Sequence, residues 1–241
     1  MIPKIIHYCW FGNSEVPTYL KKYIKSWEKY CPDYEIICWN EENYNISEHP
    51  FVREAYNNKT WALVSDYIRL DVVYKYGGIY LDTDVELLKN LDTLLENKLY
   101  VGLEQTDFLC NTGLGFGAEK GNDVVKEMRD LYDNISFDKS NLVSISCPIL
   151  NTKIIKKHVE INKGEIVKKN GIAVFPPRYF DPLSSGKSEF LLCEDSYSMH
   201  HYAATWLSTS AKMKRKIIIF VGEKRVYKIK EFIKNIKGKM S

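Results

Sequence analysis

One stretch, residues 61–86, constrains the fold of this chain more than any other; it reads WALVSDYIRLDVVYKYGGIYLDTDVE. Apolar residues recur at three- and four-residue spacing through its first half, which predicts a helix that is apolar on nearly all sides and therefore buried. Asp66 and Arg69 lie within this helix, three positions apart and so on one face. Because unpaired charge is costly in a dry interior, these two side chains must pair with each other or line a cavity that holds something polar.

The second half of the stretch predicts a strand that ends in two acidic residues. Gly77 and Gly78 end the helix, since glycine adopts a positive φ at little cost, and the apolar residues 79–81 are typical of a buried strand. Asp82 and Asp84 follow directly. Ligands of open α/β sheets bind beyond the carboxyl ends of strands, and two adjacent carboxylates repel each other unless a cation lies nearby. The pattern therefore favours Mg²⁺ or Mn²⁺ on hard oxygen ligands, although a D-x-D by itself is also typical of a solvated turn.

The segments around this stretch predict an α/β fold. Strand-like residues 2–11 and 34–39 alternate with helical residues 17–30 and 51–56, which indicates a mainly parallel, doubly wound sheet. Further along, we expect strands at 85–88, 99–104 and 114–118, a helical turn at 91–95, helices at 122–132 and 148–159, and a hairpin at 165–175. From Pro176 onwards we expect a loop, either an ordinary surface loop or a lid over a donor site.

The S-D-x-x-R of the helix and the G-G-I-Y-x-D-x-D after it together resemble the sugar-binding region of glycosyltransferase family 32. The large clostridial glucosylating toxins carry a related pattern. The specific part of the resemblance covers residues 62–84, and a weaker similarity extends from the N-terminus to about residue 206. It implies a GT-A type, Rossmann-like sheet with flanking helices.

The same resemblance implies a metal-dependent, retaining glycosyltransferase. Such an enzyme moves a hexose from a nucleoside diphosphate sugar, here expected to be UDP-galactose or UDP-glucose, onto a saccharide or lipid-linked saccharide acceptor. The expected product is capsule or another surface polysaccharide. The sequence identifies no nucleophile, and front-side attack within an ion pair would need none.

The resemblance also implies a role for each charged residue of the motifs. Asp84 is the expected direct ligand of Mn²⁺ or Mg²⁺, and Asp82 is expected to contact the ribose and to reach the metal. Arg69 would face the sugar or the phosphates, where its planar fork fits pairs of oxygen atoms. Asp66 would accept hydrogen bonds from sugar hydroxyls. Asp66, Arg69 and Asp82 are thus the expected catalytic residues, and all three also bind the donor.

Three uncharged residues are further candidates for donor binding. Trp10 ends the first predicted strand, where the family places an aromatic that stacks on the nucleotide base, and Tyr8 is a weaker candidate for the same role. Both have a simpler reading as core residues. Asn111 lies in the turn-like Cys110-Asn-Thr-Gly, which in proteins of this fold often faces the sugar, although turn chemistry alone also explains it.

A late histidine pair completes the expected site. Residues 197–206 read YSMHHYAATW, and bacterial GT-A galactosyltransferases carry a similar late H-Y followed by Trp, where the histidine completes the metal shell. On that resemblance His201 is the expected metal ligand, His200 is the second choice, and Trp206 contributes to donor binding. A histidine satisfied in the core or at the surface remains the alternative.

The end of the chain differs in charge from the rest. Residues 212–241 carry eleven Lys or Arg and two Glu, a net charge of +9, with apolar residues at helical spacing. We therefore expect a transferase domain at 1–210 and a basic amphipathic helical tail at 211–241. Each basic residue near an anionic leaflet contributes on the order of 1 kcal/mol. We recognise no signal-peptide pattern and expect a cytoplasmic location, peripheral at the inner face of the membrane unless the apolar stripe simply packs on the domain.

Other functions remain open on the sequence alone. Residues 82–84 also match the D-x-D part of the D-x-D-x-[TV] motif of haloacid dehalogenase-like phosphatases, although that motif usually begins the chain and would leave S-D-x-x-R unexplained. A non-catalytic sugar- or membrane-binding protein that keeps the fold is the other alternative, which the intact acidic residues disfavour. Nucleic acid is not an expected partner, because no recognised binding motif is present.

Overall fold

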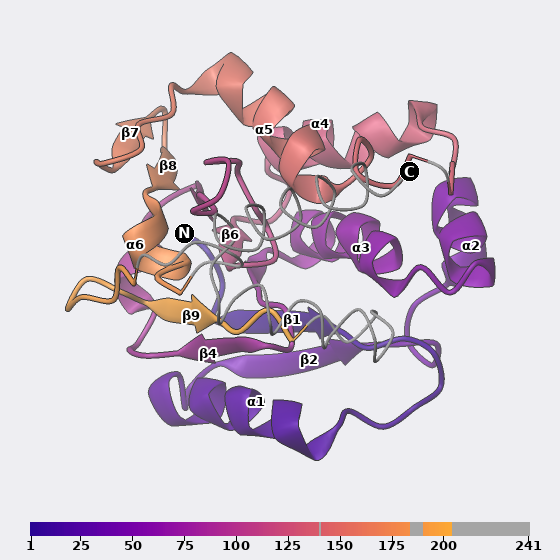
Figure 1. Ribbon diagram of the computed structural model, residues 1–241, viewed down its shortest axis with the longest axis horizontal. Helices are drawn as coiled ribbons and strands as arrows, with labels where there is room; N and C mark the ends of the chain where they lie inside the picture. Colours follow the sequence, from indigo (N-terminus) through magenta and orange to yellow (C-terminus); the bar gives the residue numbers. More distant parts are fainter. Residues whose placement is uncertain (140, 184–189, 204–241) are drawn as a thin grey trace, which may run out of the picture.

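A mixed β-sheet forms the centre of the computed structural model, which describes residues 1–139, 141–183 and 190–203 (Figure 1). Within these residues the sheet has seven strands in the order β2-β1-β3-β6-β5-β8-β7, and β4 and β9 form a separate pair. The strands are β1 Ile5–Cys9, β2 Glu35–Trp39, β3 Gly78–Tyr80, β4 Val85–Leu87, β5 Leu99–Gly102, β6 Phe116–Ala118, β7 Val167–Lys169, β8 Ile172–Phe175 and β9 Ser198–His200.

The prediction of a mainly parallel sheet is wrong. Strand β1 runs parallel to β2 and β3, and β5 runs parallel to β8, but β6 is antiparallel to both of its neighbours and β7 is antiparallel to β8. Parallel neighbours need a long crossover, usually a helix, whereas short connections join antiparallel strands. Among the described residues, strand–helix alternation extends only to β3, which ends at Tyr80, so the doubly wound pattern covers the N-terminal third of the chain.

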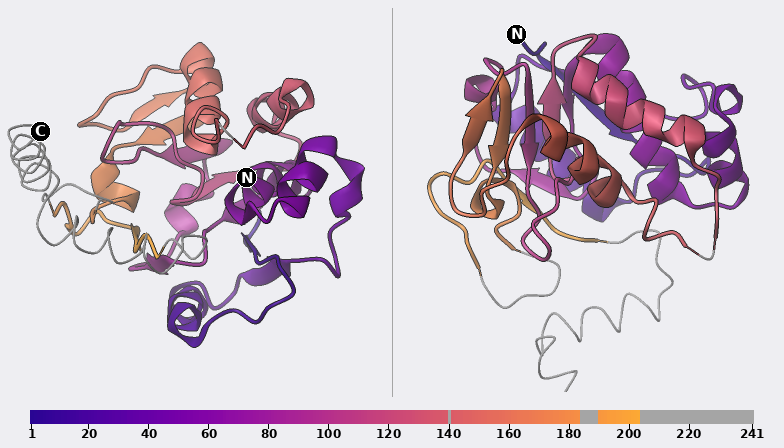
Figure 2. Two further views of the ribbon diagram at one scale, coloured as in Figure 1. Left: turned by 45° about the vertical axis from the view of Figure 1, so that its right-hand side comes forward. Right: turned by 90° about the horizontal axis from the view of Figure 1, so that it is seen from above.

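Helices cover both faces of the sheet (Figures 1 and 2). One core lies between the sheet and the helices α2 Pro50–Asn57, α3 Trp61–Tyr76, α4 Asp123–Asp130 and α5 Cys147–His158. A second core lies on the other face, against α1 Thr18–Tyr30, the short helix α6 Pro177–Phe180 and the β4–β9 pair. Successive strand residues serve opposite cores: Tyr80 packs on the α3 side, and Ile79 packs on the other.

Helix α3 is the buried helix that the sequence predicts, and the two glycines end it. Gly77 has a φ of 70°, and a Cβ there would lie 2.8 Å from the backbone nitrogen of Lys120 and from Pro3. Its N–H caps the helix by donating to the carbonyl of Val73 at 2.8 Å. Only glycine combines this backbone angle with this close approach. The turn therefore leads directly from α3 into β3, the strand that precedes the two aspartates.

Several other predicted elements are present with shifted ends. The expected helical turn is a 3₁₀ turn at Asp92–Leu94, and the helix after Asn122 continues beyond α4 as a 3₁₀ turn at Leu131–Asn134. Within the described part of the chain, no helix is long and apolar enough to cross a bilayer. The predicted basic tail lies outside the described residues.

The segment after Pro176 differs from the predicted loop. Its first part forms α6, and Phe180 and Asp181 are buried there, so this part belongs to the core. The serine- and glycine-containing part of the predicted loop, residues 184–189, lies outside the described residues. Phe180 stacks on Tyr100 of β5 with ring centroids 5.8 Å apart, and a Cβ on Gly102 would lie 2.9 Å from its ring. Two prolines had suggested a loop, but proline also starts helices well.

Candidate active site

A cavity of about 430 Å³ opens at the carboxyl ends of β1 and β3. The chain leaves β1 toward β2 on one side of it and returns as β3 on the other, so the strand order reverses here, where α/β sheets bind ligands. Its lining comes from β1, α3 and β3 with the segments after β1 and β3, from the loop that contains Asn111, from the start of α5, and from β9 and the residues after it: Cys9, Trp10, Phe11, Ser14, Trp61, Ala62, Ser65, Asp66, Arg69, Tyr80, Asp82, Thr83, Asp84, Asn111, Cys147, Pro148, His200 and Tyr202.

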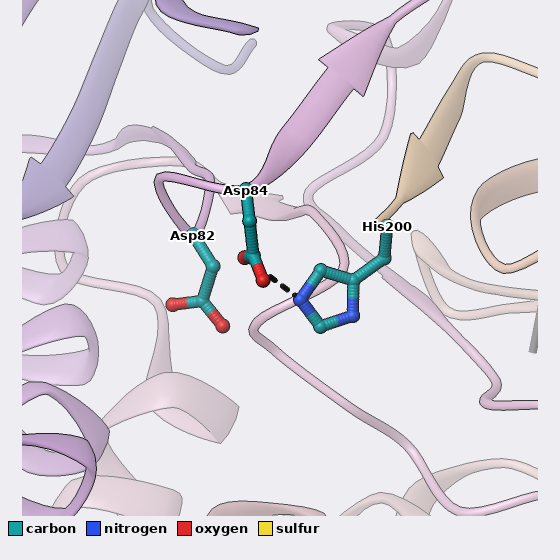
Figure 3. Close-up of side chains that lie close together, drawn as sticks. All are labelled: Asp82, Asp84 and His200. Carbon is teal, nitrogen blue, oxygen red and sulfur yellow. Dashed lines mark hydrogen bonds and ion pairs between the residues drawn. The ribbon is translucent and has the colours of Figure 1, made fainter. Parts of the chain in front are cut away.

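Two carboxylates and one imidazole that line this cavity lie close together (Figure 3). One ligand atom from each of Asp82, Asp84 and His200 lies within 4.8 Å of the others. Antiparallel pairing of β4 with β9 places His200 opposite Val85, so that its Nε2 lies 2.9 Å from Asp84 Oδ1. The backbone N–H of Ala203 donates to Asp84 Oδ2 at 2.7 Å. Hard oxygens with one imidazole suit Mn²⁺ or Mg²⁺, so the donor set fits the expected cation.

The electrostatics of the cluster also fit a cation. Burial opposes ionisation of Asp84, but His200 and the Ala203 N–H outweigh it and hold the pKa of Asp84 below its usual value. Burial likewise opposes charge on His200, yet Asp84 and then Asp82 raise its pKa. Burial raises the pKa of Asp82 against the opposing effect of Arg69, and the charge of Asp84 raises it further. A divalent ion would relieve that repulsion.

Ion pairs, a hydrogen bond and an aromatic ring fix the Arg69 side chain in place. Its Nη2 lies 3.1 Å from Asp66 Oδ1 and 3.2 Å from Asp82 Oδ1, and its Nε donates to the Ser65 carbonyl at 2.9 Å. The guanidinium carbon lies 4.6 Å from the centre of the Tyr80 ring. Burial alone would lower the pKa of Arg69, but Asp82 and its other neighbours raise it well above its usual value. The pair inside α3 therefore does both things that the sequence allowed: the two residues bond each other and line a cavity.

Asp66 also connects two helices. While its Oδ1 faces Arg69, its Oδ2 accepts the backbone N–H of Cys147, the first residue of α5, at 3.0 Å. The Cys147 Sγ in turn lies 3.7 Å from Arg69 Nη1. One carboxylate thus links α3 to the start of α5 at the cavity wall, which gives it a structural role beside the expected contact with sugar hydroxyls.

The loop that contains Asn111 packs directly on Asp82. The N–H of Asp82 donates to the Gly113 carbonyl at 3.2 Å, and the N–H of Gly113 donates to Asn111 Oδ1 at 2.8 Å. A Cβ on Gly113 would lie 2.1 Å from Asp82 Oδ2. Position 113 therefore accepts only glycine while Asp82 keeps this place. Sequence reasoning treated this glycine as turn chemistry; the Asn-x-Gly spacing was its only signal.

Aromatic side chains also line the cavity. Trp10 lies there, with its Nε1 donating to the carbonyl of Ser14 at 2.7 Å. Trp61, which the site prediction missed, lines the same cavity, and a Cβ on Gly12 would lie 3.1 Å from its ring. Tyr8 does not line the cavity; it packs edge-on against Trp27 with ring centroids 5.6 Å apart. The structure therefore places Tyr8 in the core, as its simpler reading has it.

The histidine expectation needs a correction. His201 lies outside the acidic cluster: its Nε2 is 2.7 Å from Glu86 Oε2, and its ring stacks on Tyr23 at 4.3 Å. Successive strand residues point to opposite sides, so when His200 faces Asp84, His201 cannot. The second choice, His200, is the one beside the aspartates. Trp206 lies outside the described residues.

Comparison with known proteins finds a family model that matches part of this chain. Residues 17–100 match the family model described as "Glycosyltransferase sugar-binding region containing DXD motif". The resemblance to glycosyltransferase family 32 is confirmed. The matched residues include α3 and the Asp82–Asp84 pair, so the motif of that family lies at the cavity described above.

The similar proteins are named glycosyltransferases. Inositol phosphoceramide mannosyltransferase 3 of Schizosaccharomyces pombe is 34% identical over 119 residues, which are 48% of this chain and 33% of that protein. The uncharacterized glycosyltransferase L373 of Acanthamoeba polyphaga mimivirus is 27% identical over 216 residues, 86% of this chain and 84% of that protein. The match thus spans about a third of the length of the fission-yeast mannosyltransferases.

A solved structure supports the fold. The PaToxG glycosyltransferase superposes with a TM-score of 0.54 at 19% sequence identity, over 65% of this chain and 68% of that one. At this level of identity the likeness concerns the fold alone. The prediction of a GT-A type α/β sheet with flanking helices is confirmed.

Proposed function

We propose that this chain is a metal-dependent glycosyltransferase that moves a hexose from a nucleoside diphosphate sugar onto an acceptor. The observation that carries the proposal is the position of Asp82, Asp84 and His200. They line a cavity beside a buried arginine, and the two aspartates lie inside the region that matches DXD glycosyltransferases.

Different residues of the site would bind the metal, contact the phosphates and stack on the nucleotide base. Asp82, Asp84 and His200 would hold Mn²⁺ or Mg²⁺, which, when bound, offsets the charge that develops on a diphosphate leaving group. Arg69 adds a fixed positive charge beside Asp82 and holds that carboxylate in place. Trp10, which also lines the cavity, would offer a ring face on which a nucleotide base can stack.

The relatives favour hexose donors and lipid acceptors. Their names include inositol phosphoceramide mannosyltransferases and, from Pan troglodytes, a lactosylceramide 4-alpha-galactosyltransferase that is 31% identical over 123 residues. We therefore propose a UDP-hexose donor, with galactose or glucose as the sugar, and a lipid-linked saccharide acceptor in surface polysaccharide synthesis. The reaction would retain the anomeric configuration, as the family resemblance implies.

A first experiment tests the activity itself. Purified full-length chain is incubated with UDP-galactose, UDP-glucose or GDP-mannose, with and without Mn²⁺, and nucleoside diphosphate release is measured. We expect Mn²⁺-dependent release from a UDP-hexose, and loss of release in Asp84→Ala while the melting temperature stays similar. Release of phosphate from a monoester instead would favour the phosphatase reading. Binding of sugar without any turnover would favour the non-catalytic reading, and either result contradicts the proposal.

The basic end of the chain supports a membrane location. With a net charge of +9, residues 212–241 would bind anionic lipid at the cytoplasmic face, where lipid-linked acceptors are accessible. We expect the full chain to co-sediment with anionic liposomes at low salt and to release as salt rises, since exposed charges are then screened. A chain ending at Ser210 should stay active on a water-soluble acceptor and lose liposome binding. Full-length chain that ignores such liposomes would refute this part of the proposal.

A further inference from the structure

Asn111 is held at both ends of its side-chain amide. Its Oδ1 accepts the backbone N–H of Gly113 at 2.8 Å, and its Nδ2 donates to Glu104 Oε2 at 3.1 Å. Both partners require the same orientation of the Asn111 amide group. The backbone N–H of Gly113 is a donor and must face the amide oxygen, and the accepting carboxylate oxygen of Glu104 must face the amide nitrogen. The amide has a second N–H, which is available to a ligand in the cavity that Asn111 lines.

Glu104 is itself fixed by the turn that carries both residues. Leu103 pairs with Cys110 in an antiparallel bridge, and the N–H of Glu104 donates to the Leu109 carbonyl at 2.9 Å. The N–H of Asn111 bonds the carbonyl of Gly102 at 3.0 Å. Glu104 and Asn111 therefore lie diagonally across one face of a short hairpin, where side chains of this length meet. Glu104 does not line the cavity, so it reaches a ligand only through Asn111.

We propose that Glu104 is a positioning residue for the donor substrate: it orients the Asn111 amide so that an N–H faces the cavity beside Asp82. This inference rests on the proposed function. The ligand of that N–H is an oxygen of the nucleoside diphosphate sugar, either a hydroxyl of the sugar or an oxygen of the diphosphate. Asp82 then offers a hydrogen-bond acceptor next to the hydrogen-bond donor of Asn111. Gly113 connects the two residues, because its carbonyl accepts the Asp82 N–H and its own N–H donates to Asn111 Oδ1.

Position 104 requires a hydrogen-bond acceptor and not a negative charge. Burial raises the pKa of Glu104, the Asn111 bond opposes this, and the nearby Asp181 and Asp107 raise it further. A carboxyl group offers an accepting oxygen in either protonation state. A glutamine also has one, so Glu104→Gln keeps the orientation of Asn111, whereas Glu104→Ala removes it. A glutamate that acted as nucleophile or base would give the opposite result, because glutamine can do neither.

The test is a set of single and double variants assayed with Mn²⁺ and the donor that the wild type uses. We expect Glu104→Ala and Asn111→Ala each to lower kcat/KM about ten-fold, which corresponds to one neutral hydrogen bond. Glu104→Gln should stay within about two-fold of the wild type. Adding Glu104→Ala to Asn111→Ala should change little further, since a residue that acts through another has no effect once that one is gone. Asp107→Ala, an exposed carboxylate on the same turn, is the matched control and should have no effect.

Binding measurements provide a readout that does not need turnover. Calorimetry compares UDP with the UDP-sugar on wild type, Glu104→Ala and Glu104→Gln. A loss confined to the UDP-sugar assigns the Asn111 N–H to the sugar, and an equal loss for both ligands assigns it to the diphosphate.

Three results overturn the inference. They are Glu104→Gln as damaging as Glu104→Ala, losses that add in the double variant, and an Asp107→Ala variant that loses as much as Glu104→Ala. If the wild type neither binds nor turns over any nucleotide sugar, the proposed function fails, and this inference fails with it. An active wild type with any of the three patterns rejects the inference alone.

Discussion

Gly113→Ala tests the geometry of the site with a single methyl group. The Cβ of an alanine would stand 2.1 Å from Asp82 Oδ2 and 2.9 Å from Arg69 Nη1. Because non-bonded contacts of a Cβ below 3.0 Å essentially never occur, the carboxylate must move by about 1 Å or turn away. A misplacement of about 1 Å costs on the order of 100-fold in rate when the group is part of the reacting constellation. The expected result is a roughly 100-fold lower kcat/KM and a higher Mn²⁺ requirement.

The fold should survive this change. Gly113 is not among the glycines with positive φ, so alanine can adopt its backbone angles. Gly164 provides the matched control, since a Cβ there meets nothing closer than 3.8 Å and its φ is also ordinary. The assay is Mn²⁺-dependent release of nucleoside diphosphate at several metal concentrations, with melting temperatures of both variants beside it. A Gly113→Ala enzyme with wild-type kcat/KM and metal dependence would show that Asp82 need not stay where the structure has it.

Three further predictions address the charged and titrating groups. Arg69→Lys should be nearly as damaging to kcat/KM as Arg69→Ala, because lysine loses the fork that holds Asp82; full activity with lysine would reduce Arg69 to a bulk charge. His200→Ala should weaken Mn²⁺ binding, measured by calorimetry, more than His201→Ala does, and equal effects would contradict the cluster. His7 is buried, and burial, against an opposing bond to the Gly77 carbonyl, lowers its pKa to about 4. His7 in the unfolded chain is therefore protonated near pH 6.5, whereas His7 in the folded chain stays neutral until the pH approaches 4. The free energy of unfolding decreases over this range as pH falls, by about 2 kcal/mol at pH 5. The free energy of unfolding, measured with denaturant at pH 7.5 and 5.0, should therefore fall by about 2 kcal/mol more in the wild type than in His7→Gln. Equal decreases in the two proteins would refute this prediction.

Much of the site could be predicted from the sequence because it lies within one short stretch. Helical period, two glycines and an apolar run place Asp66, Arg69, Asp82 and Asp84 relative to one another with local rules only. Their charges, in an otherwise apolar helix and at a strand end, already required either mutual pairing or a polar cavity. Residues 17–100, which match the family, contain all four.

The features that the sequence did not predict depend on contacts between segments that are distant in the chain. The sequence of Tyr197 to His201 does not show which of its two histidines faces the aspartates. The register of β9 on β4 decides this, because it pairs His200 with Val85 and so brings the His200 ring to Asp84. The direction of β6 likewise follows from which strands it joins, and not from its own residues.

Thus the sequence by itself determined the charged motif, the helix that carries it and the family resemblance, since each depends on residues close together in the chain. Only the tertiary structure decided that His200 faces the aspartates, that Gly113 must lack a side chain beside Asp82 and that Glu104 bonds Asn111. Each of these depends on which atoms come within a few ångströms after the sheet has formed, and spacing along the chain does not specify that distance.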